Sequence, residues 1–218
     1  ASVVTAPKDW VVVSSTRENV VQAKGENKVW IFPHSKKFST YVYALHGGPF
    51  KVWESTAKTK TLNVPLRVMV RQTLAKHVDP QEWFTTTQQG FAFYEDFFGY
   101  PYPYGKYDEV IVPDFNSGAM ENVAAVTYNE NRYVSRSKKT RVQLRSQAEV
   151  QLHELAHMWF GDLVTMKWWN DLWLNESFAT YASSRAQIEN TPFQEAWTDF
   201  IIDSKGGAYH QDQLVTTH

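Results

Sequence analysis

The sequence predicts an α+β fold, in which a β-rich beginning precedes a second part with long helices. From residue 1 to about residue 70, short runs of β-branched and aromatic residues alternate with turn-forming residues, as is typical of an antiparallel sheet. Beyond residue 79, three longer stretches have the capping residues and apolar faces of helices. The chain has 218 residues, of which 43% are hydrophobic, so it has enough apolar side chains for a substantial core.

The first part is expected to be the end of a β domain over residues 1–70, followed by a second domain over residues 71–218 that is incomplete at its C-terminal end. Strands are predicted at residues 10–13, 29–32, 41–45, 50–53 and 62–70. Residues 24–27 form an expected turn. The run His46-Gly47-Gly48 resembles a lipase oxyanion loop, but no G-x-S-x-G segment accompanies it, so we assign it to a turn as well.

The first helix is predicted over residues 80–98. Asp79 can cap it, Pro80 suits the first helical position, and Glu82 stands three residues after the cap. Gly99 is the expected end of this helix, and its aromatic side chains are expected in the core. Two further strands are predicted at 107–112 and 123–127, with a loop between them that leads into Gly118.

Composition excludes several classes of function. With 22 basic and 23 acidic residues the net charge is −1, which argues against a nucleic-acid partner. No run of about 18 apolar residues occurs, so we expect no membrane span in this chain. Because there is no cysteine, disulfides and thiolate chemistry are excluded, and any metal must be held by histidine and carboxylate. The same absence fits a reducing compartment, and we expect a cytoplasmic location.

A metal site is indicated by the pattern H-E-x-x-H at His153, Glu154 and His157, within a helix predicted over 140–160. Residues four apart share one face of a helix, so the two imidazoles can bind one zinc ion. Glu154 follows the first histidine directly, and its carboxylate can therefore lie beside the metal without binding it. This is the position of a general base for a metal-activated water.

A third metal ligand is indicated by Glu176, which lies among Trp, Leu, Phe and Ala residues in a helix predicted over 171–187. A buried, unpaired carboxylate is unfavourable, and either a metal ion or a salt bridge stabilises it. Gly161 is expected to end the preceding helix, and the connection after it is long enough to return the second helix against the first. Three protein ligands with one open position are typical of catalytic zinc.

These motifs resemble the M1 family of zinc aminopeptidases, the aminopeptidase N group. The resemblance rests on H-E-x-x-H, then eighteen intervening residues, then Glu176 within W-L-N-E-S-F-A, and on G-A-M-E-N at residues 118–122. It covers most of the chain and is strongest over residues 101–188. It implies a thermolysin-like zinc peptidase core preceded by the end of an antiparallel β domain, with further N- and C-terminal domains of the parent protein missing from this chain.

The resemblance also implies roles for individual residues. In the family the G-A-M-E-N segment lies along the substrate as an edge strand, and its glutamate, here Glu121, holds the free α-amine of the peptide. Gly118 and Ala119 are expected to offer backbone hydrogen bonds to the peptide, and Met120 belongs to the same substrate-binding segment. We also expect Asn175, which precedes the third ligand, to support a metal ligand.

The implied function is a zinc-dependent exopeptidase that removes N-terminal amino acids from peptides, with Glu154 as general base. Its expected partner is a peptide substrate with a free N-terminus. Two alternatives stay open. One is a zinc endopeptidase of thermolysin type, which differs at the amine anchor, and the other is a non-catalytic zinc-binding fragment or scaffold.

The last part of the chain is expected to contain one more helix over residues 191–204, capped by Thr191 and ended by Gly206 and Gly207, and then a polar tail over 211–218. Members of the family stabilise the oxyanion with a tyrosine some tens of residues beyond the third ligand. Tyr181 and Tyr209 are too near to Glu176 for this role. We therefore expect the catalytic tyrosine to lie outside this chain.

Overall fold

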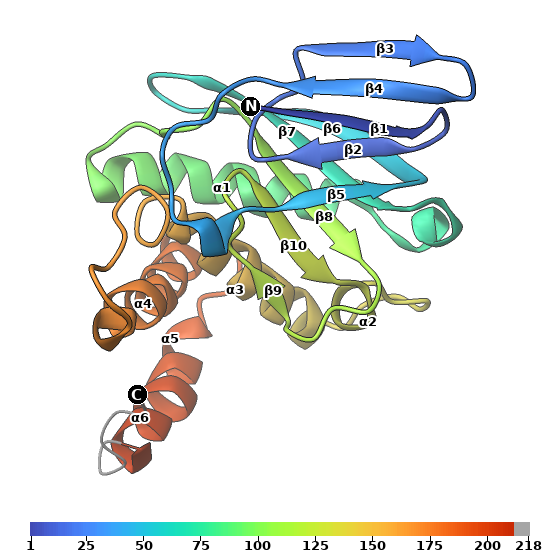
Figure 1. Ribbon diagram of the computed structural model, residues 1–218. Coiled ribbons are helices and arrows are strands. Elements are labelled where there is room, and N and C mark those ends of the chain that lie inside the picture. Colours follow the sequence, from blue (N-terminus) through green and yellow to red (C-terminus); the bar gives the residue numbers. More distant parts are fainter. Residues whose placement is uncertain (212–218) are drawn as a thin grey trace.

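The computed structural model describes residues 1–211 and arranges them in three layers (Figure 1). Strands from the beginning of the chain form the outer layer, and a five-stranded sheet forms the middle layer. Long helices cover the opposite face of that sheet. The mixed α and β content predicted from the sequence is confirmed.

The outer layer consists of two small antiparallel sheets. Its strands are β1 Ser2–Pro7, β2 Val11–Ser14, β3 Val20–Lys24, β4 Asn27–Phe32 and β5 Leu45–Gly48. One sheet has the order β1-β4-β3, and the other pairs β2 with β5. The strands predicted at 10–13 and 29–32 are confirmed. Strands β1 and β3 are additional to the prediction, and β3 is exposed at every residue, so it lacks the buried face that marks a strand in a sequence.

Two predictions in the outer layer are wrong. The strand expected over 41–45 is replaced by a short 3-10 helix, η1 (Thr40–Val42), whose Val42 carbonyl accepts a hydrogen bond from Val123 N at 3.0 Å. The turn expected at residues 46–48 is part of β5, where Gly47 lies opposite Val12. A Cβ at Gly47 would make an ordinary van der Waals contact with the ring of Trp10, at 3.6 Å, so glycine is not required at this position of the strand.

The middle layer is one sheet with the strand order β6-β7-β8-β10-β9. Its strands are β6 Phe50–Lys58, β7 Asn63–Arg71, β8 Tyr107–Val112, β9 Ala119–Met120 and β10 Ala125–Asn129. Strands β7, β8 and β10 run parallel, and β6 and β9 are antiparallel edge strands. The strands predicted at 50–53, 62–70 and 107–112 are confirmed, and the one predicted at 123–127 begins two residues later. The boundary expected at residue 70 falls inside β7, one residue before the strand ends, and β7 pairs with β8 in the same sheet. The division into two domains stays a prediction.

The helical layer is formed by four elements: α1 Pro80–Phe98, α2 Glu130–Tyr133, α3 Arg141–His157 and α4 Leu172–Asn190. Helix α1 begins and ends as predicted, because the Asp79 side chain accepts from Gln81 N and Gly99 has a left-handed φ of 62°. Thr140 and Gln143 form a capping box at the start of α3. None of the helices in residues 1–211 is both long enough and apolar enough to cross a membrane.

Helix α3 ends earlier than predicted, at His157 rather than near Phe160. The next residues form a compact turn, in which Asp162 N donates to His157 O at 3.0 Å and Val164 N donates to Trp159 O at 3.0 Å. The last carbonyl group of the helix, that of His157, is therefore satisfied by the turn instead of by another helical residue. Gly161 lies within this turn, with a φ of 131°.

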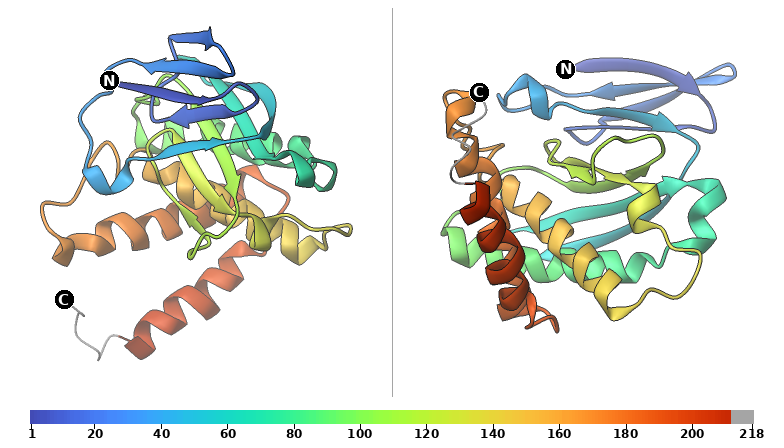
Figure 2. Two further views of the ribbon diagram at one scale, coloured as in Figure 1. Left: turned by 45° about the vertical axis from the view of Figure 1, so that its right-hand side comes forward. Right: turned by 90° about the horizontal axis from the view of Figure 1, so that it is seen from below.

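The helix predicted over 191–204 is wrong in its bounds. A helical segment begins at α5 (Ala196–Asp199), continues as the π-helix η4 (Phe200–Lys205) and ends in α6 (Gly206–Gln211). Gly206 has a helical φ of −60° and ψ of −46°, so it continues the helix instead of ending it. Figure 2 shows the segment projecting from the helical layer. The rest of the predicted polar tail, residues 212–218, lies outside the described residues.

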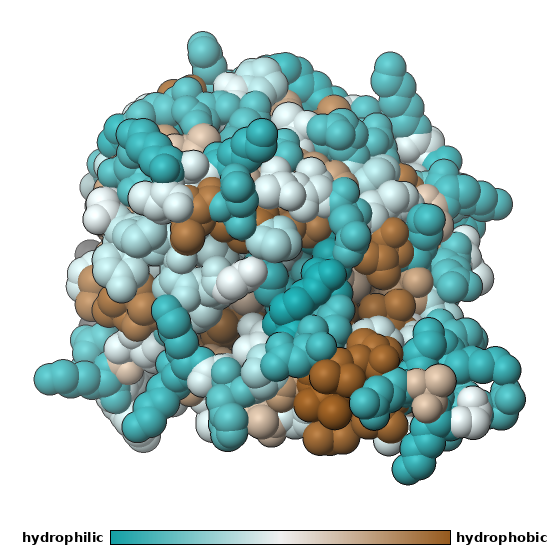
Figure 3. Space-filling view, turned by 90° about the horizontal axis from the view of Figure 1, so that it is seen from above, coloured by the Kyte–Doolittle hydropathy of each residue, from teal (hydrophilic) through white to brown (hydrophobic). Residues whose placement is uncertain are grey.

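Apolar side chains fill both interfaces of the middle sheet. The larger cluster lies on the helical side and contains buried residues of β7, β10, α1 and α3, among them Leu66, Val68, Trp83, Val126 and Leu152. A smaller cluster lies between the sheet and the outer strands and consists of the buried residues Val13, Phe50, Met69, Val110 and Ala125. The view from above in Figure 3 shows mainly hydrophilic side chains with smaller apolar groups between them.

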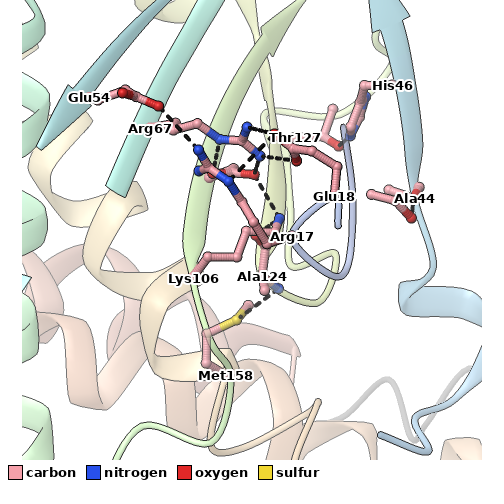
Figure 4. A network of polar contacts seen from close by, with 12 residues as sticks. Arg17, Glu18, Ala44, His46, Glu54, Arg67, Lys106, Ala124, Thr127 and Met158 are labelled. Carbon is pink, nitrogen blue, oxygen red and sulfur yellow. Dashed lines mark hydrogen bonds and ion pairs between the residues drawn. The ribbon is translucent and has the colours of Figure 1, made fainter. Parts of the chain in front are cut away.

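Buried charges also join the outer layer to the middle sheet (Figure 4). Arg67 of β7 donates to the Asp108 carboxylate of β8 through Nε at 2.8 Å and Nη2 at 2.6 Å, and Lys106 Nζ donates to the same carboxylate at 2.7 Å. Arg67 Nη1 also donates to Glu18, in the connection between β2 and β3, at 2.9 Å. Lys106 Nζ donates in addition to Ala124 O at 2.7 Å. The network thus ties the outer layer, the sheet and the segment before β10 together.

A second buried acid, Glu109 of β8, lies at the centre of the interface between sheet and helices. The Thr87 hydroxyl of α1 donates to it at 3.0 Å, and the Gln151 amide of α3 donates to it at 2.8 Å. The residue is 1% exposed, and this burial raises the pKa of Glu109 to about 8. In the folded protein the carboxyl group therefore keeps its proton at neutral pH.

Replacing Glu109 by glutamine is expected to remove part of the pH dependence of stability. In the unfolded chain the group ionises near its ordinary value of 4.5, whereas in the folded protein it ionises only near 8. Between these values the folded state binds one more proton, so the free energy of unfolding of the parent falls as pH rises, by up to about 1.4 kcal/mol per pH unit. Urea unfolding from pH 5 to pH 8 should show the parent losing stability relative to Glu109→Gln. Parallel curves would contradict a protonated buried carboxyl.

Candidate metal centre and substrate site

Helices α3 and α4 bring the three predicted metal ligands together. His153 and His157 stand one turn apart on α3, and their Nε2 atoms are 2.9 Å apart. Glu176 of α4 places Oε2 3.4 Å from His153 Nε2 and 3.8 Å from His157 Nε2. Its side chain is 49% exposed, so the burial expected from its apolar neighbours in the sequence is wrong, because Trp173 and Leu174 are themselves exposed. The connection after α3 turns back as predicted, so the donor atoms of side chains from two helices point to one place.

Each histidine is held through its second ring nitrogen. His157 Nδ1 lies 3.0 Å from Phe160 O, which can only accept, so Nδ1 carries the hydrogen and Nε2 keeps its lone pair. His153 Nδ1 lies 3.4 Å from the Thr180 hydroxyl, which itself donates to Glu176 O at 3.0 Å. Burial and then the neighbouring His153 lower the pKa of His157, which keeps its ring neutral and able to bind a metal.

Asn175 lies beneath these ligands and is 3% exposed. Its Nδ2 donates to the Tyr41 hydroxyl at 3.0 Å and to Glu121 Oε1 at 3.4 Å. A Cβ at Gly161 would lie 2.5 Å from Asn175 Oδ1 and 3.2 Å from His157 Nδ1. Glycine is therefore required for Asn175 to approach the ring of His157, and the expected supporting role of Asn175 stays a prediction with this contact in its favour.

Glu154 points into the protein beside the ligands and is 5% exposed. Its Oε2 has no hydrogen-bond partner among the described residues, and the same is true of both carboxylate oxygens of Asp162. Burial, followed by the charges of Glu121, Glu176 and Asp162, raises the pKa of Glu154 well above its ordinary value. The site thus gathers buried carboxyl groups that a positive charge would stabilise.

These observations fit a divalent cation bound by His153, His157 and Glu176. Two neutral imidazole nitrogens and one carboxylate oxygen are a known donor set of catalytic zinc. The three donor atoms lie within 4.8 Å of one another. A cation at this place also opposes the repulsion among the carboxylates and lowers the pKa of Glu154 toward the range of a base that works at neutral pH.

The G-A-M-E-N segment lies at the edge of the middle sheet. Strand β9 pairs with β10, with Met120 opposite Thr127 and Ala119 opposite Tyr128, and its other edge has no strand partner within residues 1–211. Gly118 O accepts a hydrogen bond from Asn129 N at 2.9 Å, which fixes the start of the segment. The prediction of an edge strand is confirmed, and such an edge can pair with an extended peptide.

Glu121 follows β9 directly and is 5% exposed. One of its carboxylate oxygens lies within 4.8 Å of donor atoms of Glu154 and His157. Burial raises the pKa of Glu121, and hydrogen bonds from the backbone and from Asn175 act against this rise. The predicted amine anchor therefore stands beside the predicted base and the metal ligands.

Three further side chains at the site belong to none of the sequence motifs and were not predicted: Tyr41, Asp162 and Thr180. Thr180 follows Glu176 by one helical turn, and this spacing is a signal that could have been used. Asp162 is 2% exposed, but a single acid after a glycine has no pattern of its own. Tyr41 lies 134 positions from its partner Asn175, and nothing local connects the two.

Comparison with known proteins agrees with these motifs. The model of the peptidase family M1 domain matches residues 83–218. Aminopeptidase N of Streptomyces lividans is 46% identical over 217 residues, which are 99% of this chain and 25% of that protein. Tricorn protease-interacting factor F2 of Thermoplasma acidophilum is 36% identical over 218 residues, 100% of this chain and 27% of that protein. Leucyl aminopeptidase of Saccharolobus solfataricus is 37% identical over 202 residues, 91% of this chain and 25% of that protein.

The chain thus spans about a quarter of the length of these curated relatives. The family match extends over more than half of the chain and includes α3, α4 and the edge strand β9. The segments that build the candidate site are therefore those that the family shares, and the chain belongs to peptidase family M1.

Proposed function

We propose that this chain carries the catalytic zinc centre of an aminopeptidase, which removes N-terminal amino acids from peptides. The main support is that Glu121 lies beside the candidate metal centre, with its oxygen within 4.8 Å of donor atoms of Glu154 and His157. Two relatives that are named aminopeptidases match 99% and 91% of this chain. A thermolysin-like core is part of this proposal, since α3 lies against the edge strand β9 and α4, which carries the third ligand, packs on α3.

In this proposal His153, His157 and Glu176 hold the zinc ion. When bound, zinc supplies a Lewis acid that polarises the peptide carbonyl and lowers the pKa of water. Glu154 takes the proton from the attacking water and returns it to the leaving amine, as its unpaired Oε2 and its place beside the ligands suggest. Phe160 O and Thr180 hold the two imidazole rings in the orientation that metal binding requires.

Glu121 would bind the N-terminal ammonium group of the substrate. A charge-assisted hydrogen bond to a buried carboxylate is strong, and a peptide without the ammonium leaves that carboxylate unpaired. The free edge of β9, including Gly118 and Ala119, would hold the first residues of the peptide in an extended conformation, with Met120 in the same segment. Together these contacts favour attack at the first peptide bond, so the substrate is a peptide with a free N-terminus.

N-acetylation of the substrate is expected to abolish hydrolysis. The chain would be loaded with one equivalent of zinc and tested on leucine anilide and on its N-acetyl form. Losing a hydrogen-bonded ion pair corresponds to about 10- to 100-fold or more in rate. Equal cleavage of both substrates would favour a thermolysin-type endopeptidase. Tightly bound zinc without any turnover would favour a non-catalytic zinc-binding fragment or scaffold.

A further inference from the structure

We propose that Tyr41, from the N-terminal part of the chain, is a positioning residue for the amine anchor. Its hydroxyl holds the Asn175 amide in the orientation that donates to the Glu121 carboxylate. The ligand concerned is a primary ammonium group, and the inference rests on the proposed function because it concerns how that group is bound.

Tyr41, Asn175 and Glu121 form a short chain of hydrogen bonds. Asn175 Nδ2 donates to the Tyr41 hydroxyl at 3.0 Å and to Glu121 Oε1 at 3.4 Å. An amide nitrogen has two hydrogens, so each acceptor can take one. The three residues come from η1, from α4 and from the segment after β9, so three separate parts of the fold meet at this amide.

The surroundings of Asn175 select one orientation of its amide. Its Oδ1 lies on the side of Gly161 and His157, because a Cβ at Gly161 would be 2.5 Å from that oxygen and 3.2 Å from His157 Nδ1. Reversing the amide would turn the oxygen toward the Glu121 carboxylate and the amino group toward the protonated Nδ1 of His157. The shorter of the two bonds that hold the observed orientation is the one to Tyr41.

Tyr41 is itself held in place from two sides. The next residue, Val42, is fully buried, and its carbonyl accepts from Val123 N at 3.0 Å, two residues after Glu121. On the other side, the rings of Tyr41 and Trp169 pack edge to face with a centroid distance of 5.3 Å, close to the start of α4. The hydroxyl is thus fixed between the segment that carries Glu121 and the helix that carries Asn175.

This arrangement has a consequence for Glu121. The carboxylate is nearly buried, and it binds an ammonium group best when it is ionised. Donation from Asn175 favours the ionised form over the neutral one. Removing the Tyr41 hydroxyl leaves the amide with a single, longer contact, so we expect a weaker anchor even though Tyr41 is neither a metal ligand nor the anchor itself.

The test is binding of leucinamide and of N-acetyl-leucinamide to the zinc-loaded chain, measured by calorimetry with Glu154→Gln present in every variant so that the ligands are not hydrolysed. For Tyr41→Phe we expect leucinamide to bind about three- to tenfold more weakly, the range of one hydrogen bond, with binding of the acetylated ligand and of zinc unchanged. In the Glu121→Gln background the same substitution should have no further effect, because the anchor is already lost. Tyr43→Phe is the matched control, since Tyr43 is 48% exposed and lies two residues away.

Two results would overturn the inference. One is unchanged binding of leucinamide by Tyr41→Phe, and the other is equal weakening of both ligands, which would indicate a general structural effect. A different failure would concern the proposed function. If the chain that keeps Tyr41 and Glu121 does not prefer leucinamide over its acetylated form, Glu121 is not an amine anchor, and this inference falls with it.

Discussion

Replacing Glu154 by glutamine is expected to abolish turnover while zinc remains bound. The three ligand atoms belong to His153, His157 and Glu176, so the substitution removes none of them. Glutamine also has the same shape as the Glu154 side chain, so the arrangement of the ligands should not change. The amide cannot take a proton from water, and loss of a positioned general base costs about 10²- to 10⁴-fold in rate. Zinc content and hydrolysis of leucine anilide by the same sample are the two measurements.

Glu189→Gln is a suitable control for this experiment. Glu189 is a partly exposed acid at the end of α4, where it forms an ion pair with Arg185 away from the metal ligands. Its replacement should leave both zinc content and turnover unchanged. Turnover retained by Glu154→Gln would show that another group accepts the proton. Loss of both zinc and turnover would show that the arrangement of the metal ligands is damaged, and the experiment would then not identify Glu154 as the base.

The cluster of His153, His157 and Glu176 could be predicted from the sequence because two of its three members belong to one short pattern, H-E-x-x-H. His153, Glu154 and His157 lie within one helical turn and a half, and the helical period alone places both imidazoles on one face. The strands β7 and β8 could also be predicted from the sequence, since each contains three consecutive apolar residues that are mostly β-branched, Val68-Met69-Val70 in β7 and Val110-Ile111-Val112 in β8. By contrast, β3 is exposed at every position and left no such pattern.

The remaining features depend on contacts between distant parts of the chain. The aromatic residues near Tyr41 suggested a strand, but a hydrogen bond from Val123 to Val42 accompanies a 3-10 turn instead. The two glycines at 206–207 suggested a helix end, yet the intrinsic preference against glycine is only about 1 kcal/mol and a continuing helix overrides it. The contact between Tyr41 and Asn175 spans 134 positions. No window of local sequence contains such information.

These long-range contacts also change how the N-terminal part is understood. A division at residue 70 suggests a β domain beside the site. In the structure, Tyr41 bonds to Asn175 within the candidate site, and Glu18 bonds to Arg67 of the middle sheet. Loss of the N-terminal part would therefore remove the contact of Tyr41 with Asn175 in the candidate site, and it would also expose one face of the middle sheet.

The largest effect on stability is expected from Asp108→Asn. Asp108 is fully buried and neutralises two cations, Arg67 and Lys106, that are 3% and 1% exposed. Without this carboxylate Lys106 has no acidic partner within residues 1–211, and Arg67 keeps only Glu18. Breaking a buried ion pair in this way destabilises a protein by about 3–5 kcal/mol. Asp96→Asn is the matched control, because its pair with Lys60 is exposed and such pairs contribute only about 0–1 kcal/mol. Urea unfolding measures both changes. Adding Lys106→Met to Asp108→Asn should recover part of the lost stability, since it removes the unpaired charge. A loss for Asp108→Asn no larger than that of the control would contradict the conclusion that Asp108 balances both buried cations.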